Sequence, residues 1–195
     1  MNFIYPITLS GQHAQLEPLS MEHHDGLVAA VCDGELWKLW YTSVPTPEGM
    51  RAEIDRRLGL LQQGSMLPFV VRRLDTGAVC GMTTFMNVYA VNQRVEIGST
   101  WYAASAQRTA INSECKLMLL SLAFETLGCI AVEFRTNWMN HASRTAIARL
   151  GAKQDGVLRN HIKMADGMYR DTVVFSIINQ EWPMVKRHLQ FKLER

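Results

Sequence analysis

The segment 113–127 constrains the fold of this 195-residue chain most strongly, because the helix that it predicts is apolar on nearly every face. Its apolar residues are Leu117, Met118, Leu119, Leu120, Leu122, Phe124 and Leu127. A helix without a polar face has to be covered on all sides by other elements. We therefore expect this helix to lie at the centre of the molecule, and Gly128 to end it.

Capping and turn signals on both sides of this helix predict alternating strands and helices. Before the apolar helix we expect a strand opening at Leu16, a helix capped by Ser20 that runs through Asp33, and a helix from Thr46-Pro47 to Gly64. Strands at 69–73 and 79–88, joined by a turn at 75–77, and a strand at 95–102 then follow. After the apolar helix we expect a strand at 129–135, a helix at 140–150, and two extended runs around Asp166-Gly167, the second at 169–178. The fold class is mixed α and β. No repeat or linker interrupts the chain, so we expect residues 1–195 to form a single domain.

Composition and charge exclude several classes of protein. The net charge of +2 comes from nearly balanced acids and bases, and no basic stripe of the kind that binds nucleic acid is visible. No apolar run approaches the roughly 20 residues of a membrane span, and the first ten residues do not resemble a secretory signal. We expect a soluble cytoplasmic protein without a nucleic-acid or membrane partner.

The cysteines and histidines give no sign of a metal site or a thiol nucleophile. The cysteines lie far apart, without a CxxC pair, at Cys32, Cys80, Cys115 and Cys129. In a chain of this size, such cysteines are reduced and mostly buried. His23 and His24 lack the HExxH spacing of metalloproteases. We expect no metal.

Several motifs occur in a fixed order and together resemble the GNAT superfamily of acetyltransferases. They are Glu96-Ile97-Gly98, the loop 107–112, the apolar helix, Asn140-x-x-Ser143 and Leu150-Gly151-Ala152. The closer resemblance is to the branch of ribosomal-protein alanine N-acetyltransferases, and it extends to the segment 155–160 and to Glu181-Trp182-Pro183. The resemblance implies a mostly antiparallel, twisted central sheet with two splayed parallel strands, flanked by helices on both faces. It also implies transfer of an acetyl group from acetyl-CoA to a primary amine.

The loop 107–112 leads into the apolar helix, where backbone amides without intrahelical partners can bind an anion. The resemblance makes this loop the cradle of the CoA pyrophosphate, although Ala110 and Asn112 replace the small glycine-type residues of the family pattern. It also places the backbone at the end of the strand 95–102 beside the pantetheine arm. The residues that we expect to bind the cofactor are Trp101, Tyr102, Gln107, Arg108, Thr109, Ala110, Ile111, Asn112, Ser113 and Asn140.

Glu96 and Ser143 are the candidate catalytic residues. A carboxylate just before Ile97-Gly98 can take a proton from the amine, and Gly98 permits a bulge there. A salt-bridged strand residue without a catalytic part is the alternative. The resemblance places Ser143 close to the thioester sulfur, where other branches have a tyrosine acid. A helix cap, in which Asn140 accepts from the Ser143 amide, explains the pair without any chemistry.

The segment 35–41 is dense in aromatic residues, and the resemblance makes it one wall of the acceptor site, with Trp37, Trp40 and Tyr41 as substrate-binding residues. Aromatics at helical spacing are more typical of packing. The acceptor is expected to be a protein or peptide N-terminus. The alternatives are a small amine, such as an amino acid, polyamine or antibiotic, and a non-catalytic acetyl-CoA sensor. The partners are thus acetyl-CoA and an amine acceptor, and a homodimer is left open.

Overall fold

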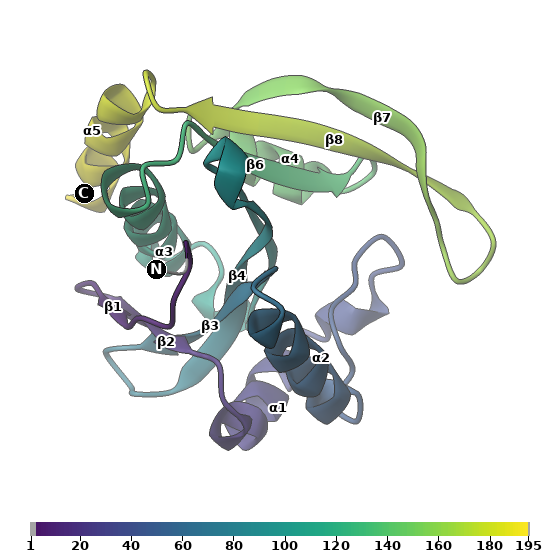
Figure 1. Ribbon diagram of the computed structural model, residues 1–195. Helices are drawn as coiled ribbons and strands as arrows, with labels where there is room; N and C mark the ends of the chain where they lie inside the picture. Colours follow the sequence, from purple (N-terminus) through teal and green to yellow (C-terminus); the bar gives the residue numbers. More distant parts are fainter. Residues whose placement is uncertain (1–2, 195) are drawn as a thin grey trace.

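One sheet runs through the computed structural model, which describes residues 3–194 (Figure 1). The sheet has eight strands in the order β1-β2-β3-β4-β5-β6-β8-β7. Every neighbouring pair is antiparallel except β5 and β6, which are parallel. The strands are β1 (Leu9–Ser10), β2 (Ala14–Pro18), β3 (Leu67–Arg73), β4 (Val79–Tyr89), β5 (Arg94–Tyr102), β6 (Ala131–Asn137), β7 (Lys153–Lys163) and β8 (Tyr169–Ile178). The predicted mixed fold and its mostly antiparallel sheet are confirmed.

Helices cover both faces of this sheet, as Figure 1 shows. They are α1 (His24–Cys32), α2 (Met50–Gln62), α3 (Ala110–Ser121), α4 (His141–Ala148) and α5 (Trp182–Leu193). The helices α1 and α2 pack on β3 and β4 from one side, and α3 packs between the sheet and α5 on the other side. A π-helical turn, Leu122–Thr126, extends α3. No helix among residues 3–194 is long and apolar enough to cross a membrane.

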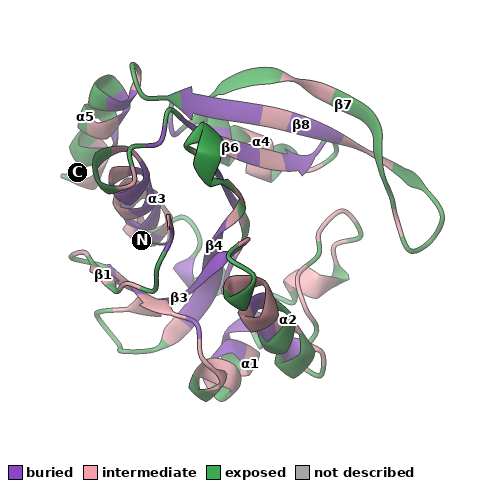
Figure 2. Cartoon of the chain, viewed as in Figure 1, coloured by how far each residue is buried: buried purple, intermediate pink, exposed green. Residues whose placement is uncertain are grey.

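Apolar residues from both layers form one continuous core (Figure 2). Phe69 and Phe85 meet edge to face on β3 and β4, with ring centroids 6.3 Å apart. Leu119 and Leu120 of α3 are fully buried, which confirms the central position of that helix. Each fully buried side chain of this size contributes about 1.5–3 kcal/mol relative to an exposed one. The tip of the β7–β8 hairpin lies outside this core and is exposed.

Three parts of the fold differ from the sequence-based expectation. The helix α2 begins at Met50 instead of Thr46-Pro47, because residues 46–49 form a turn in which the Gly49 N–H donates to the Thr46 carbonyl. The helix α3 begins at Ala110 instead of Ser113, because Thr109 is its cap. The helix α5 was not predicted, although Pro183 in its first turn and the apolar residues Val185 and Leu189 are typical helix signals.

Three of the four cysteines are buried as expected, while Cys32 is exposed. Burial raises the pKa of Cys80 and of Cys129 to about 11, and the pKa of Cys115 to about 12. These three thiols stay protonated at neutral pH, and a protonated thiol is a poor nucleophile.

Candidate active site

The two parallel strands separate after a short paired stretch. Pairing between β5 and β6 ends at Glu96 and Glu133. Beyond this divergence point β5 continues to Tyr102 beside β4 alone, and β6 continues to Asn137 beside β8 alone. The facing edges of β5 and β6 therefore carry backbone N–H and C=O groups without a strand partner. Such edges bind an extended molecule as though it were one more strand.

A β-bulge in β5 lies directly after the divergence point. The β4–β5 register shifts between Met82 and Thr84, so that Ser99 and Thr100 stand opposite a single residue of β4. Ser99 has φ 48°, in the left-handed region that non-glycine residues seldom adopt. The predicted irregularity at Gly98 is thus present one residue further along the strand. Residues held in this region cost about 1–3 kcal/mol and are often found at functional sites.

Gly98 is required because there is no room for a side chain at this position, and not because its backbone adopts an unusual conformation. A Cβ atom at this position would lie 2.7 Å from the sulfur of Met86 and 3.0 Å from the carboxylate of Glu96. A larger residue would therefore push the Glu96 side chain away from its place at the divergence point.

Glu96 is buried, with 5 % of the residue exposed. Asn87 Nδ2 donates a hydrogen bond to its Oε2 atom at 2.7 Å, and Arg135 Nε lies 3.5 Å from the same oxygen. Burial raises the pKa of Glu96, and the charge of Glu133 adds to this rise, while Asn87, Arg135 and Arg170 oppose it. A carboxylate whose pKa is raised towards neutrality is better suited to act as a general base.

A groove of about 790 Å³ on one face of the sheet is lined by Arg94, Glu133 and Arg135, the neighbours of Glu96 on β5 and β6. Side chains alternate between the two faces of a strand, so the side chain of Arg94 shares this face with Glu96, as Glu133 does with Arg135 on β6. Charged groups of both signs line the groove, among them Asp155 of β7. Arg94 and Arg135 both form ion pairs with Glu133.

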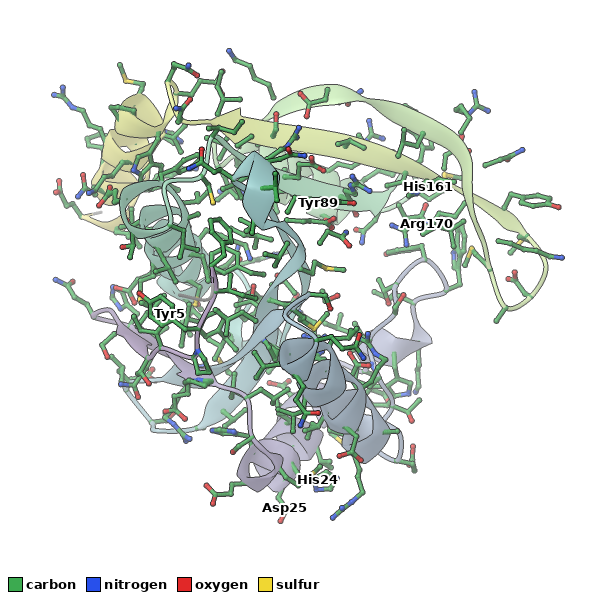
Figure 3. All side chains as sticks on the ribbon, in the orientation of Figure 1. Tyr5, His24, Asp25, Tyr89, His161 and Arg170 are labelled. Atoms are coloured by element: carbon green, nitrogen blue, oxygen red, sulfur yellow. The ribbon has the colours of Figure 1, made fainter. Side chains whose placement is uncertain are left out.

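The β7–β8 hairpin adds Arg170 to this charged face. Arg170 and Thr172 lie on the same face of β8, and His161 Nδ1 of β7 is 3.1 Å from Thr172 Oγ1. Figure 3 shows His161 and Arg170 on the hairpin as it extends away from the helices. Burial lowers the pKa of Arg170, and the charge of Glu96 acts against that change. Sequence analysis did not single out either residue.

The start of α3 lies at the far end of β5. Thr109 Oγ1 accepts from the Ile111 N–H at 3.3 Å and donates to the Ala106 carbonyl at 2.7 Å. Ala110 to Ser113 therefore lie in the first helical turn and not in a loop. The first turn of a helix has N–H groups without intrahelical acceptors and a positive dipole end, which together favour an anion.

Gln107 connects the helix start to the free end of β5, because its Nε2 donates to the Tyr102 carbonyl at 3.0 Å. Arg108 is exposed and has φ 60°. Trp101 and Tyr102 are 4 % and 8 % exposed, so that their side chains belong to the core. Only their backbone is left to contact an extended ligand, and of its groups the Tyr102 carbonyl already accepts from Gln107.

Asn140 and Ser143 lie across the divergence, at the start of α4. Asn140 Oδ1 accepts from the Ser143 N–H at 3.0 Å, which is the helix cap that the sequence predicted. Among residues 3–194, no hydrogen bond or ion pair connects either residue with Glu96. A chemical role for Ser143 remains a prediction.

Of the aromatic residues in the segment 35–41, one packs against the core and another is exposed. Trp37 packs against the core from a 3-10 turn, Leu36–Lys38. Trp40 is 55 % exposed and meets Tyr41 edge to face at 5.5 Å. The packing interpretation therefore suits Trp37 and not Trp40, whose ring is available to a partner.

Sequence analysis missed two buried cations, Arg57 of α2 and Lys116 of α3, which are 2 % and 6 % exposed. The sequence contains a sign that each of these two residues is buried. Arg57 lies in the apolar stripe of its helix beside Ile54, and Lys116 lies within the most apolar helix of the chain. A charged residue at a core position is rarely buried without a specific partner.

Comparison with known proteins gives one family. The model described as an acetyltransferase (GNAT) domain matches residues 14–153. YdaF of Bacillus subtilis (strain 168), a candidate ribosomal N-acetyltransferase, is 31 % identical over 109 residues, which span 56 % of this chain and 58 % of YdaF. The match thus covers less than two thirds of that relative.

Solved structures resemble the whole chain. A GCN5-related N-acetyltransferase from Brucella melitensis is 28 % identical with a TM-score of 0.85, over 97 % of this chain and 86 % of that one. RimJ of Mycobacterium smegmatis, solved in complex with CoA-disulfide, is 21 % identical with a TM-score of 0.80, over 96 % and 95 % of the two chains, and shares the fold.

Proposed function

Because this chain belongs to the GNAT acetyltransferase family and is an N-acetyltransferase, we propose that it moves the acetyl group of acetyl-CoA onto the N-terminal α-amine of a protein or peptide. The observation that carries this proposal is the divergence of β5 and β6, with the start of α3 at the end of the free β5 edge. The relative named for ribosomal acetylation supports a protein acceptor. We further propose that residues 1–195 act as one domain, since one sheet connects the described residues from β1 to β7.

The residues at the end of β5 fit the shape and charge of acetyl-CoA. The first turn of α3, with Gln107 and Arg108 before it, holds the anionic phosphates through N–H groups and the helix dipole. The Cβ atoms of Ala110 and Asn112 limit how closely phosphates approach. The β5 edge that faces away from β4, up to Trp101 and Tyr102, lies along the extended arm, although the Tyr102 carbonyl already accepts from Gln107.

The proposed reaction is a direct transfer between two bound substrates. The thioester supplies an activated acetyl group. Glu96 accepts a proton from the attacking amine, and Asn87 orients the carboxylate that does so. Backbone N–H groups on the free edge of β5 stabilise the negative charge that develops on the carbonyl oxygen. Ser143 donates a proton to the departing sulfur.

The groove beside Glu96 supports an extended acceptor. Because its charged groups have both signs and lie on the face of Glu96, it suits the polar backbone of a chain whose amine reaches the divergence point. The exposed ring of Trp40 offers a second contact for the acceptor.

An amine panel tests the proposed function. Peptides with varied first residues, free amino acids, polyamines and aminoglycosides are compared by thiol release from acetyl-CoA. We expect release with peptides alone. Release with a small amine but no peptide would identify a small-molecule acetyltransferase, and tight acetyl-CoA binding with no turnover would identify a sensor.

The substitution Ala110→Glu tests the phosphate site. Saturating acetyl-CoA should raise the free energy of unfolding of the wild type by RT ln(1 + [L]/Kd), about 2.7 kcal/mol at a hundredfold excess over Kd. A carboxylate at residue 110 should abolish this gain, because it repels the phosphates and fills their place. Thermal unfolding with and without the cofactor measures it. Ala52→Glu, in the exposed first turn of α2, is the matched control and should keep the gain.

A further inference from the structure

The side chain of Lys116 is buried in the core beside β4 and β5. Its Nζ donates to the hydroxyls of Thr83 and Thr100, at 3.2 and 3.1 Å, and these hydroxyls lie 2.8 Å from each other. No carboxylate pairs with it among residues 3–194, since the adjacent Glu114 accepts hydrogen bonds from the β1–β2 turn instead. Burial lowers the pKa of Lys116 to about 8, and the neighbouring Cys115 has a smaller opposite effect.

Arg57 lies on the other face of the sheet and uses its full guanidinium group. Its Nη1 donates to Thr84 Oγ1 at 2.7 Å, and its Nη2 donates to the Ser99 carbonyl at 3.2 Å. Its Nε pairs with Glu53 at 2.7 Å. The side chain thus joins α2 to the bulge of β5.

The two cations hold the same piece of backbone from opposite sides. Thr83 and Thr84 are consecutive on β4, so their side chains point to opposite faces, one towards α3 and one towards α2. Figure 1 shows these helices on the two sides of β4. The bulge of Ser99 and Thr100 lies opposite Thr83, next to the Thr84–Gly98 pair, and each residue of the bulge is held by one cation.

Stability alone does not account for this arrangement. Removing a charge from water is costly, and apolar residues of similar volume are often as stable or more stable at such positions. The free edge of β5, in contrast, starts just after Glu96 and includes this bulge. A non-glycine residue with positive φ keeps one conformation only where its surroundings enforce it.

We propose that Arg57 and Lys116 are positioning residues, which hold the Ser99–Thr100 bulge so that the free backbone of β5 binds the acyl-carrying arm of acetyl-CoA. The inference rests on the proposed function. Neither side chain acts on the reacting atoms. Loss of either contact lets the bulge relax and turns the backbone donors away from the arm.

Two matched pairs of variants test this role. Lys116→Met keeps the length of the side chain and removes its charge, and the exposed Lys153→Met is its control. Arg57→Lys keeps the charge and removes the planar fork, and Arg56→Lys is its control, because Arg56 binds the same Glu53 from the exposed face of α2. Lys116→Gln, which retains a hydrogen-bond donor, is the rescue variant.

The readout compares two ligands by calorimetric titration. Acetyl-CoA contains the arm, whereas adenosine 3′,5′-bisphosphate contains only the nucleotide end. In Lys116→Met and Arg57→Lys we expect the affinity for acetyl-CoA to fall about ten- to hundredfold, as for one lost hydrogen bond to a charged group, with the affinity for the bisphosphate unchanged. Both controls should behave as wild type, and Lys116→Gln should recover part of the loss.

Each outcome is decisive. Equal losses for both ligands would assign the two cations a purely structural role and overturn the inference, as would unchanged affinities. If Lys116→Met does not fold, Lys116→Gln and Arg57→Lys carry the comparison. A wild type that acetylates peptides while the variants bind normally refutes the positioning role alone. A wild type that does not bind acetyl-CoA refutes the proposed function and this inference with it.

Discussion

At the scale of single residues, Glu96 shows how burial tunes a carboxylate at an otherwise polar face. Its raised pKa comes first from loss of water, and the hydrogen bond from Asn87 and the charge of Arg135 prevent a larger rise. Because its pKa is raised, this carboxylate is a better base than an exposed glutamate.

The variant Glu96→Gln tests the general base through the pH dependence of the rate. An α-amine has a pKa near ~7.7–8.0, so most of the acceptor is protonated at pH 6.5 and must lose a proton. We expect kcat/KM to fall about 10²- to 10⁴-fold at pH 6.5, with a smaller loss at pH 9, where free amine is abundant. A loss of equal size at both pH values would contradict the assignment.

Glu133→Gln is the matched control for Glu96. Because the charge of Glu133 raises the pKa of Glu96, its removal should shift the acidic limb of the pH profile to lower pH and leave the plateau largely intact.

The stability of the protein gives a second test of the Glu96 pKa. The folded pKa of Glu96 is raised above 4.5, the ordinary value of a glutamate, so its contribution to the free energy of unfolding falls as pH rises from that value through the folded pKa. Glu96→Gln should remove this fall, as urea unfolding at pH 4 and pH 7 would show.

At the scale of elements, two variants at the start of α4 distinguish a capping role from a catalytic role. Asn140→Ala removes the acceptor of the Ser143 N–H and should lower the free energy of unfolding by about 0.5–2 kcal/mol. Ser143→Ala leaves the backbone cap in place and should be nearly as stable as wild type. If the Ser143 hydroxyl donates a proton to the leaving thiolate, whose thiol form has a pKa near ~8.5, kcat should fall in Ser143→Ala and recover partly at high pH. An unchanged kcat would leave Ser143 with the cap alone.

At the scale of the whole molecule, α3 joins the N-terminal strands to the rest of the core. The Glu114 carboxylate accepts from the backbone N–H groups of Gln12, His13 and Ala14 at 2.6, 2.8 and 2.8 Å. A Cβ atom on Gly11 would lie 2.2 Å from the Glu114 carboxyl carbon. One buried carboxylate thus fixes a turn about a hundred residues away in sequence.

Gly11→Ala should destabilise the protein, because the added methyl group displaces a carboxylate that serves three N–H groups. Hydrogen bonds to charged groups contribute about 1.5–3 kcal/mol each, so we expect a loss of at least about 2 kcal/mol. Gly59→Ala in α2 is the matched control, since its Cβ atom would meet nothing within 4 Å. In a helix interior this change should stabilise by about 0.5–1 kcal/mol. Urea unfolding of the two variants should give shifts of opposite sign.

Features that depend on residues close together in the chain could be predicted from the sequence. The turn at Gly77, the end of α2 at Gly64 and the end of α4 at Gly151 all have positive φ, as their positions predicted. The cap at Asn140 and the central place of α3 were also readable, because cap chemistry and helix periodicity are local properties. The motif order sufficed for the family.

The assembly of the site, in contrast, could not be predicted without the folded structure. Where β5 and β6 separate, which side chains face Glu96, and which cations reach the bulge all depend on residues distant in sequence. Lys116 and Thr83 are 33 positions apart, and Arg57 and Ser99 are 42 apart. A buried charge becomes tolerable only when folding brings polar partners to it, and no local pattern records those partners.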